Sequence, residues 1–214
     1  METKAVLTGD LIGSTDAGSP AVDRAIDILA DSARHISQWA GADTRFTRFR
    51  GDGWQLYLDF PGLVLTACVY LSARLRASNC GLTSRISVGL GPVDRLGTTN
   101  LADASGDAFT RSGHGLDHIK RSDRLVMDGG GAMAGFFRGI FAQTAFQVSR
   151  WSHEQAEAVA LALDREGRTQ QDLAKDLGIS RQALLARLNS AGFHALDQTL
   201  NAFEGYDFPH EQAR

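Results

Sequence analysis

Residues 4–15, KAVLTGDLIGST, and residues 45–58, RFTRFRGDGWQLYL, decide how we interpret this chain. Each stretch has the apolar and β-branched pattern of a strand, and each delivers an aspartate beside a glycine, Asp10 in the first and Asp52 in the second. The Gly-Asp-Gly of the second stretch predicts a hairpin with Asp52 at its tip. Two carboxylates on neighbouring strands, beside a loop of small residues, suit a divalent cation that carries a polyphosphate. The alternative is that both aspartates are ordinary turn residues.

The composition is that of a soluble globular protein. The chain has 214 residues, 43% hydrophobic and 22% charged, which is enough for one medium domain and a small one. No apolar run approaches the ~20 residues that span a bilayer, and no signal-peptide pattern opens the chain, so we expect a cytoplasmic protein with no membrane partner. The net charge of -3 gives no general attraction to nucleic acid. Cys68 and Cys80 have neither metal nor redox spacing.

The order of apolar patterns predicts the fold class. The order β-α-β-β-α-β, followed by a further helix and strand, matches the split βαβ, ferredoxin-like plan of an α/β (α+β) domain. The expected elements are a strand over 4–10, a helix over 21–39, a hairpin over 44–59, a helix over 62–77, a strand over 85–91, a helix over 106–120 and a strand over 124–127. An aromatic cluster is expected to close the core: Phe136, Phe137, Ile140, Phe141 and Phe146.

From Ser152 onward the pattern changes to short helices. Ser152 and Thr169 each open a helix with capping-type spacing, and Ser180 can cap a helix after the turn at Gly178. This succession is typical of a helix-turn-helix. We therefore expect a ferredoxin-like domain over 1–149, a small all-α helix-turn-helix domain over 150–206 and a loose tail over 207–214. The positions expected to meet DNA are Ser180, Arg181, Gln182 and Arg187, although the local excess of positive charge is mild and a dimer or partner contact is the alternative.

Four motifs in order, GDLIGST, FRGDGW, VGLGPV and GDAFTRSGHGL, resemble the class III nucleotidyl cyclase homology domain over roughly residues 1–148. With the helix-turn-helix behind them, the whole chain resembles the small bacterial SatD-like proteins. The resemblance implies that Asp10 and Asp52 bind two Mg²⁺ or Mn²⁺ ions, which activate a 3′-hydroxyl and neutralise pyrophosphate. It also implies a nucleoside triphosphate bound in a homodimer. The backbone expected to hold the metal and the triphosphate is that of Leu11, Ile12, Gly13, Ser14 and Thr15.

The resemblance leaves the base and the catalysis open. Arg48 falls where purine cyclases carry a base-selecting lysine, and Asp103 where adenylate-specific members carry an aspartate. The arginine side chain presents a planar fork of donors, whereas lysine presents a point charge. The identity of the base is therefore open, and a pyrimidine nucleotide is one of the alternatives. Thr110 stands in place of the asparagine that positions the ribose. His114 stands in place of the arginine whose positive charge stabilises the transition state, and a neutral histidine lacks that charge. Three nearby cations could substitute for that arginine: Arg111, Lys120 and Arg121.

Three functions follow from these residues. The first is a regulator that binds a nucleoside triphosphate with Mg²⁺ and adjusts DNA or partner binding. The second is an active nucleotidyl cyclase that makes a 3′,5′-cyclic nucleotide across a homodimer interface. The third is a helix-turn-helix regulator whose α/β domain binds something unrelated. Thr110 and His114 favour the first. Arg45, Arg48 and Arg50 are expected on one strand face, either as phosphate or base contacts or as a solvated face.

Overall fold

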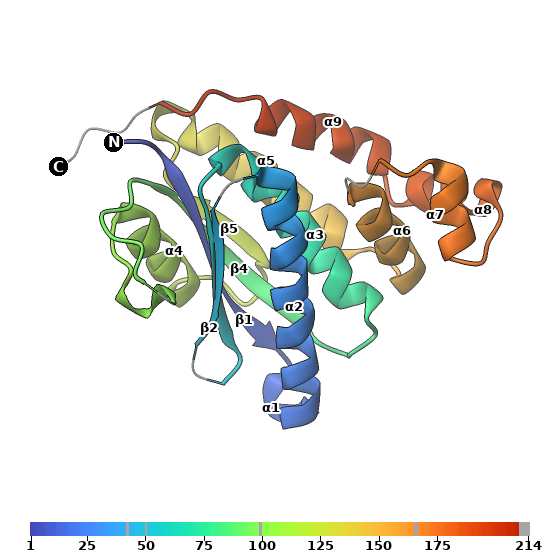
Figure 1. The fold of residues 1–214 in the computed structure, drawn as a ribbon, viewed down its shortest axis with the longest axis horizontal. Helices are drawn as coiled ribbons and strands as arrows, with labels where there is room; N and C mark the ends of the chain where they lie inside the picture. Colours follow the sequence, from blue (N-terminus) through green and yellow to red (C-terminus); the bar gives the residue numbers. More distant parts are fainter. Residues whose placement is uncertain (42, 50, 99, 165–166, 210–214) are drawn as a thin grey trace.

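Five strands in the described part of the chain form a single sheet (Figure 1): β1 (Lys4–Ile12), β2 (Thr44–Arg48), β3 (Gly53–Leu58), β4 (Thr83–Gly91) and β5 (Leu125–Asp128). The computed structural model describes residues 1–41, 43–49, 51–98, 100–164 and 167–209. The strand order is β2-β3-β1-β4-β5. β1 pairs antiparallel with β3 and β4, β2 pairs antiparallel with β3, and β5 lies parallel to β4. The first four strands have the ferredoxin-like order, so the predicted mixed α/β class is confirmed.

The first face of the sheet carries the main core. Side chains alternate between the two faces of a strand, and Ala5, Leu7 and Leu11 of β1 point into this core. Helices α2 (Ser19–Ala40) and α3 (Val64–Ala77) cover it, the latter after a short 3₁₀ turn, η1 (Pro61–Leu63). Helix α5 (Ala134–Ser149) packs against β5 and α3 on the same side. Burial of these apolar surfaces is what positions β1 between β3 and β4.

The second face is covered by helix α4 (Asp107–Asp117) and by the loop that contains η2 (Leu101–Asp103). A small cluster that includes Val6 and Tyr57 lies under them. Next to it, Thr8 Oγ1 accepts a hydrogen bond from Gln55 at 3.0 Å and lies 2.8 Å from Ser112 Oγ. Helix α4 comes so close that a Cβ at Gly89 would stand 2.0 Å from the Ala108 carbonyl oxygen, so only glycine permits this packing.

The predicted helix starts after Trp151 are confirmed. Ser152 and Thr169 each accept a hydrogen bond from the backbone N–H three residues later, in capping boxes, and Ser180 accepts one from Ala183. These residues open α6 (His153–Leu163), α7 (Gln170–Asp176) and α8 (Arg181–Ser190), and α9 (Phe193–Glu204) follows. Buried residues of all four helices belong to the same hydrophobic cluster as the sheet, and α7 and α8 form the end of the molecule farthest from β2 (Figure 1).

The expected aromatic cluster is wrong at two positions. Phe136 and Phe146 are 62% and 57% exposed, because only one side of α5 faces the sheet, and Phe137 and Phe141 occupy that side.

The expected loose tail is packed in part. Phe208 lies against Phe137 with ring centroids 5.7 Å apart, and the Pro209 carbonyl accepts a hydrogen bond from Thr3 at 2.8 Å. Residues 210–214 lie outside the described residues.

Two short helices complete the described chain. A single helical turn, α1 (Ser14–Ala17), follows β1, and a 3₁₀ turn, η3 (Gly131–Met133), precedes α5. None of the helices in the described ranges combines the length and the apolar character that a membrane crossing needs.

Candidate functional site

Asp10 and Asp52 come together at one end of the sheet. Asp10 lies near the end of β1 and pairs across the sheet with Gly53, the first residue of β3. Asp52 directly precedes Gly53, so it lies at the turn that joins β2 to β3. The hairpin that the Gly-Asp-Gly pattern predicts is therefore formed, and it brings the second carboxylate beside the first.

Arg85 forms an ion pair with the first of these aspartates, and no motif in the sequence marks it. It lies on β4 directly opposite Asp10, where its Nε donates to Asp10 Oδ1 at 2.9 Å and its Nη2 donates to Oδ2. The Asp10 and Arg85 side chains are 24% and 33% exposed. The hydrogen bond to Asp10 raises the pKa of Arg85, burial opposes the rise, and the charges of Asp10 and Asp52 add to it. The site therefore contains a resident cation in a bidentate ion pair.

The loop after β1 lies against the second carboxylate. Ser14 Oγ donates a hydrogen bond to Asp52 Oδ2. The Gly13 carbonyl accepts from the backbone N–H groups of Asp16 and Ala17, which closes the turn of α1. Gly13 has a φ of +88°, in the left-handed region that favours glycine. Of the other loop positions, Leu11 is buried in the core, Ile12 is half-buried and Thr15 is exposed.

The donor set can hold a divalent cation only after a rearrangement. Carboxylate and carbonyl oxygens are the ligands that Mg²⁺ and Mn²⁺ prefer. Within the described ranges, no group of three or more His, Cys, Asp or Glu residues could hold a metal. The Arg85 fork also engages both oxygens of Asp10. The residues therefore fit a divalent cation that arrives with further oxygen ligands, for example those of a polyphosphate. This cation would replace the Arg85 guanidinium on Asp10.

The expected arginine face is wrong. Side chains on a strand alternate with a period of two, so Arg45 and Arg48, three residues apart, point to opposite faces. Arg45 donates to the Gly97 carbonyl at 3.0 Å on the second face. Arg48 pairs with Asp23 of α2 at 2.8 Å on the first face, whereas Asp10 faces the second. Arg50, the third member of the expected stripe, lies outside the described residues.

The residues that the resemblance assigns to catalysis lie on α4 and in the loop before it. Thr110 and His114 are exposed, while Ala108 and Ser112 are buried against the sheet. Arg111 donates to the Leu90 carbonyl and to Asp107. Asp103 is exposed, and its carbonyl accepts from Arg95 at 2.8 Å. Among the described residues, no hydrogen bond or ion pair joins these groups to Asp10 or Asp52.

Three of the four expected DNA-contacting residues lie at the start of α8, and the fourth, Arg187, lies in its last turn. Ser180, Arg181 and Gln182 are exposed, and Arg181 donates to Gln170 Oε1 of α7 at 3.0 and 3.2 Å. Arg187 instead donates to Glu157 of α6 at 3.0 Å, with its side chain 25% exposed. The structure therefore presents three of the four residues on the outer surface and ties the fourth to a neighbouring helix.

Comparison with known proteins finds similarity to solved structures but not to known sequences. The chain matches no protein-family model and no curated protein sequence. It is similar to the crystal structure of the guanylyl cyclase Cya2, with a TM-score of 0.40 and 14% sequence identity over 59% of this chain and 74% of that one. A likeness of this size carries no functional argument, so the function of the site has to be argued from its own residues.

Proposed function

We propose that this protein binds a nucleoside triphosphate together with Mg²⁺ or Mn²⁺ at the Asp10–Asp52 end of the sheet, and that it responds to the nucleotide rather than converting it. The observation that carries the proposal is the bidentate Asp10–Arg85 pair beside Asp52. Two carboxylates against one guanidinium leave an excess of negative charge, which favours a divalent cation. The cation and the phosphates would arrive as one complex and complete the oxygen shell.

Each residue then has a separate task. Asp10 and Asp52 supply the oxygens that hold the cation, and Ser14 keeps the Asp52 carboxylate in position. Arg85, released from Asp10, presents a planar fork of N–H donors to the phosphate oxygens. The Arg85 guanidinium exchanges the Asp10 carboxylate for the phosphate, so it is never left as a partly buried charge without a partner. In this proposal the ion pair holds the site together until the nucleotide replaces it.

A regulatory role accounts best for α4 and the C-terminal helices. Thr110 and His114 offer no permanent positive charge to a transition state. The exposed residues Ser180, Arg181 and Gln182 at the start of α8 would form the output surface, for DNA or for a partner protein. This assigns 1–149 to nucleotide binding and 150–206 to a helix-turn-helix output.

The second candidate is an active nucleotidyl cyclase. The exposure of Thr110 and His114 favours it, since it leaves both side chains accessible to a second copy in a homodimer.

The test uses the purified chain with ATP, GTP, CTP or UTP plus Mn²⁺, followed by thermal unfolding and mass spectrometry of the nucleotide. One nucleotide should raise the unfolding temperature by mass action without forming a cyclic product. Asp10→Asn and Asp52→Asn should lose this effect, and the exposed Asp16→Asn should keep it. A cyclic product that disappears in Asp10→Asn would establish the cyclase instead. Equal behaviour of all four nucleotides and all three variants would reject both.

Arg85→Gln separates the two parts of the proposal. Removal of the resident cation should strengthen Mn²⁺ binding in the absence of nucleotide, because Asp10 loses its competitor. It should weaken nucleotide binding at saturating Mn²⁺ about tenfold or more, because a charged donor to phosphate is lost. Isothermal titration with and without nucleotide measures both effects. If Arg85→Gln changed the affinity for Mn²⁺ and the affinity for nucleotide in the same direction, Arg85 would not move from Asp10 to the phosphates.

A further inference from the structure

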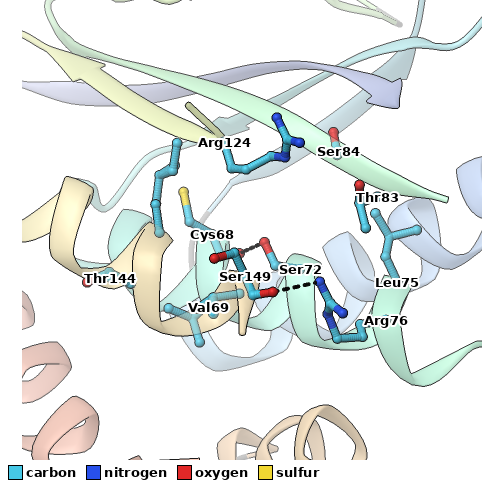
Figure 2. A pocket seen from close by; sticks show the side chains of 13 residues that line it. Cys68, Val69, Ser72, Leu75, Arg76, Thr83, Ser84, Arg124, Thr144 and Ser149 are labelled. Carbon is cyan, nitrogen blue, oxygen red and sulfur yellow. Dashed lines mark hydrogen bonds between the residues drawn. The ribbon is translucent and has the colours of Figure 1, made fainter. Parts of the chain in front are cut away.

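A pocket separate from the Asp10 site lies on the first face of the sheet (Figure 2). Its walls come from α3, from α5 and from the beginnings of β4 and β5. The pocket is open to solvent on one side, and its space measures about 560 Å³ with that open side included. It therefore suits a small molecule that keeps part of its surface in solvent.

Two arginines stand on different sides of this pocket. Arg76 comes from α3 and Arg124 from the residue before β5, and Figure 2 shows both side chains at its edge. Arg76 Nη2 donates to the Ser149 carbonyl at 3.2 Å, and Arg124 Nη1 donates to the Arg121 carbonyl at 2.9 Å. These acceptors are neutral. Within the described ranges, no carboxylate forms an ion pair with either guanidinium, and no Asp or Glu lines the pocket. Among the described residues, the pocket therefore holds two guanidinium groups that no carboxylate pairs with.

The rest of the lining is apolar with a few hydroxyl groups. Ala145 and Val148 of α5 are half-buried and offer apolar surface to the pocket, above Val69 and Leu75, which are 1% and 2% exposed. Ser72 and Thr83 add hydroxyl groups, of which Ser72 Oγ donates to the Cys68 carbonyl at 2.8 Å and keeps its lone pairs for a further donor. A pocket with charged edges and an apolar wall suits a molecule with an anionic head and a short apolar part.

We propose that this pocket binds a small organic anion, with its carboxylate or phosphate head between Arg76 and Arg124 and its apolar part against Ala145 and Val148. Arginine is the side chain best suited to both heads, because its planar fork matches their oxygen atoms. Each guanidinium spends one N–H group on its backbone acceptor and has others to donate. The site does not depend on the nucleotide proposal, since the two sites share no side chain that binds the ligand.

The experiment follows backbone amide signals by NMR while acetate, hexanoate or hexyl phosphate is added to the full chain at matched ionic strength. Hexanoate or hexyl phosphate should produce saturable shifts at Ser72, Thr83 and Ala145, and should bind more tightly than acetate because of the apolar wall. Whichever of the two binds more tightly identifies the head group. Absence of saturable shifts with both would overturn the proposal, and so would equal binding of acetate and the longer anions.

Matched variants connect binding to the two arginines. Arg124→Gln and Arg76→Gln should each weaken binding about tenfold or more, the effect of one lost charged hydrogen bond. Arg138→Gln, on the same helix as Val148 but 56% exposed, should leave binding unchanged and excludes a general charge effect. Asp10→Asn should also leave it unchanged, which separates this site from the proposed nucleotide site. Arg124→Gln matters most, because Arg76 also stabilises the end of α5. Unchanged binding in Arg124→Gln with intact amide signals would overturn the proposal.

Discussion

Gly9 lies opposite Trp54 in the sheet, and the indole fills the space where a side chain at position 9 would stand. A Cβ there would approach Trp54 Cε2 and Cζ2 at 2.5 Å and the Arg85 carbonyl oxygen at 2.7 Å. The indole is held by the hydrogen bond from its Nε1 to Ser84 Oγ at 3.0 Å. Gly9→Ala should therefore lower the free energy of unfolding in urea by about 1–3 kcal/mol.

Gly139→Ala is the matched control for Gly9→Ala. Gly139 lies within α5, and a Cβ there meets nothing within 4 Å. Alanine in a helix is favoured over glycine by up to about 1 kcal/mol, so this variant should be slightly more stable than the original chain. Equal stability of Gly9→Ala and the original chain would mean that Trp54 is not held where the structure places it.

The Asp31 carboxylate makes stability depend on pH. Arg34 Nη2 and Arg74 Nη2 each donate to it at 2.7 Å. The hydrogen bond from Arg34, followed by the one from Arg74, holds the pKa of Asp31 below its ordinary value of 3.8, against the opposing effect of burial. A lowered pKa adds stability above the ordinary value, and this stability is lost as pH falls through the folded pKa.

Asp31→Asn tests this dependence. The Asp31 side chain is 35% exposed, so at neutral pH the variant should lose less than about 1 kcal/mol. The difference from the original chain should shrink at about pH 3, because the Asp31 carboxyl of the unfolded original chain, with its ordinary pKa of 3.8, is then mostly protonated and the ion pair adds less stability. Urea unfolding at the two pH values measures it. The exposed Asp27→Asn on the same helix is the control, and a difference that grows in acid would contradict the sign.

Single residues also show what the sequence could predict of the site. Asp10 and Asp52 could be identified because Gly-Asp and Asp-Gly mark the ends of alternating strands. Arg85 could not, because its contact with Asp10 depends on the register between strands 75 residues apart in the chain. Arg45 and Arg48 cannot share one strand face as expected, because strand side chains alternate with a period of two and these residues are three apart.

The capping boxes give a direct test of how the C-terminal helices begin. Thr169 Oγ1 accepts from the Asp172 N–H at 3.3 Å, and Asp172 Oδ2 accepts from the Thr169 N–H at 3.0 Å. Thr169→Ala removes the first bond and should cost about 1 kcal/mol in urea unfolding. Thr169→Ser keeps the hydroxyl and should cost less than half as much. An equal loss in both variants would point to the methyl group rather than to the cap.

Helix α5 shows why some elements were harder to predict than others. The strands and the capped helices carry strong local signals: alternation, glycine turns, and Ser or Thr before the first turn. Helix α5 carries five large apolar residues with no Ser, Thr, Asp or Asn cap, because Met133 precedes it. Its apolar side chains lie on more than one side, so composition alone could not tell the buried Phe137 from the exposed Phe136. Only the packing of α5 against β5 decides which stripe is covered.

Aromatic residues of α9 and α5 connect the last helix to the core that covers the sheet. Phe203 of α9 lies edge-on to Phe137 and Phe141 of α5, with ring centroids 5.0 and 5.6 Å apart, and it is 3% exposed. The hydrophobic cluster that contains it continues through α3 to β1. We infer that the predicted C-terminal helices unfold together with the sheet rather than as a separate unit, because removing them would expose the same core.

Phe203→Ala should therefore destabilise the whole chain. A buried phenylalanine replaced by alanine costs about 3–5 kcal/mol, a large part of the roughly 5–15 kcal/mol that stabilises a typical domain. Urea unfolding followed by circular dichroism and by fluorescence, to which the buried Trp54 in the sheet contributes, should shift to the same lower midpoint with both signals. Phe146→Ala on α5 is the control, since its ring is 57% exposed and the change should stay within about 0.5 kcal/mol. If the fluorescence midpoint stayed unchanged while the circular dichroism midpoint shifted, α9 would fold separately from the sheet. The C-terminal helices would then form an independent domain.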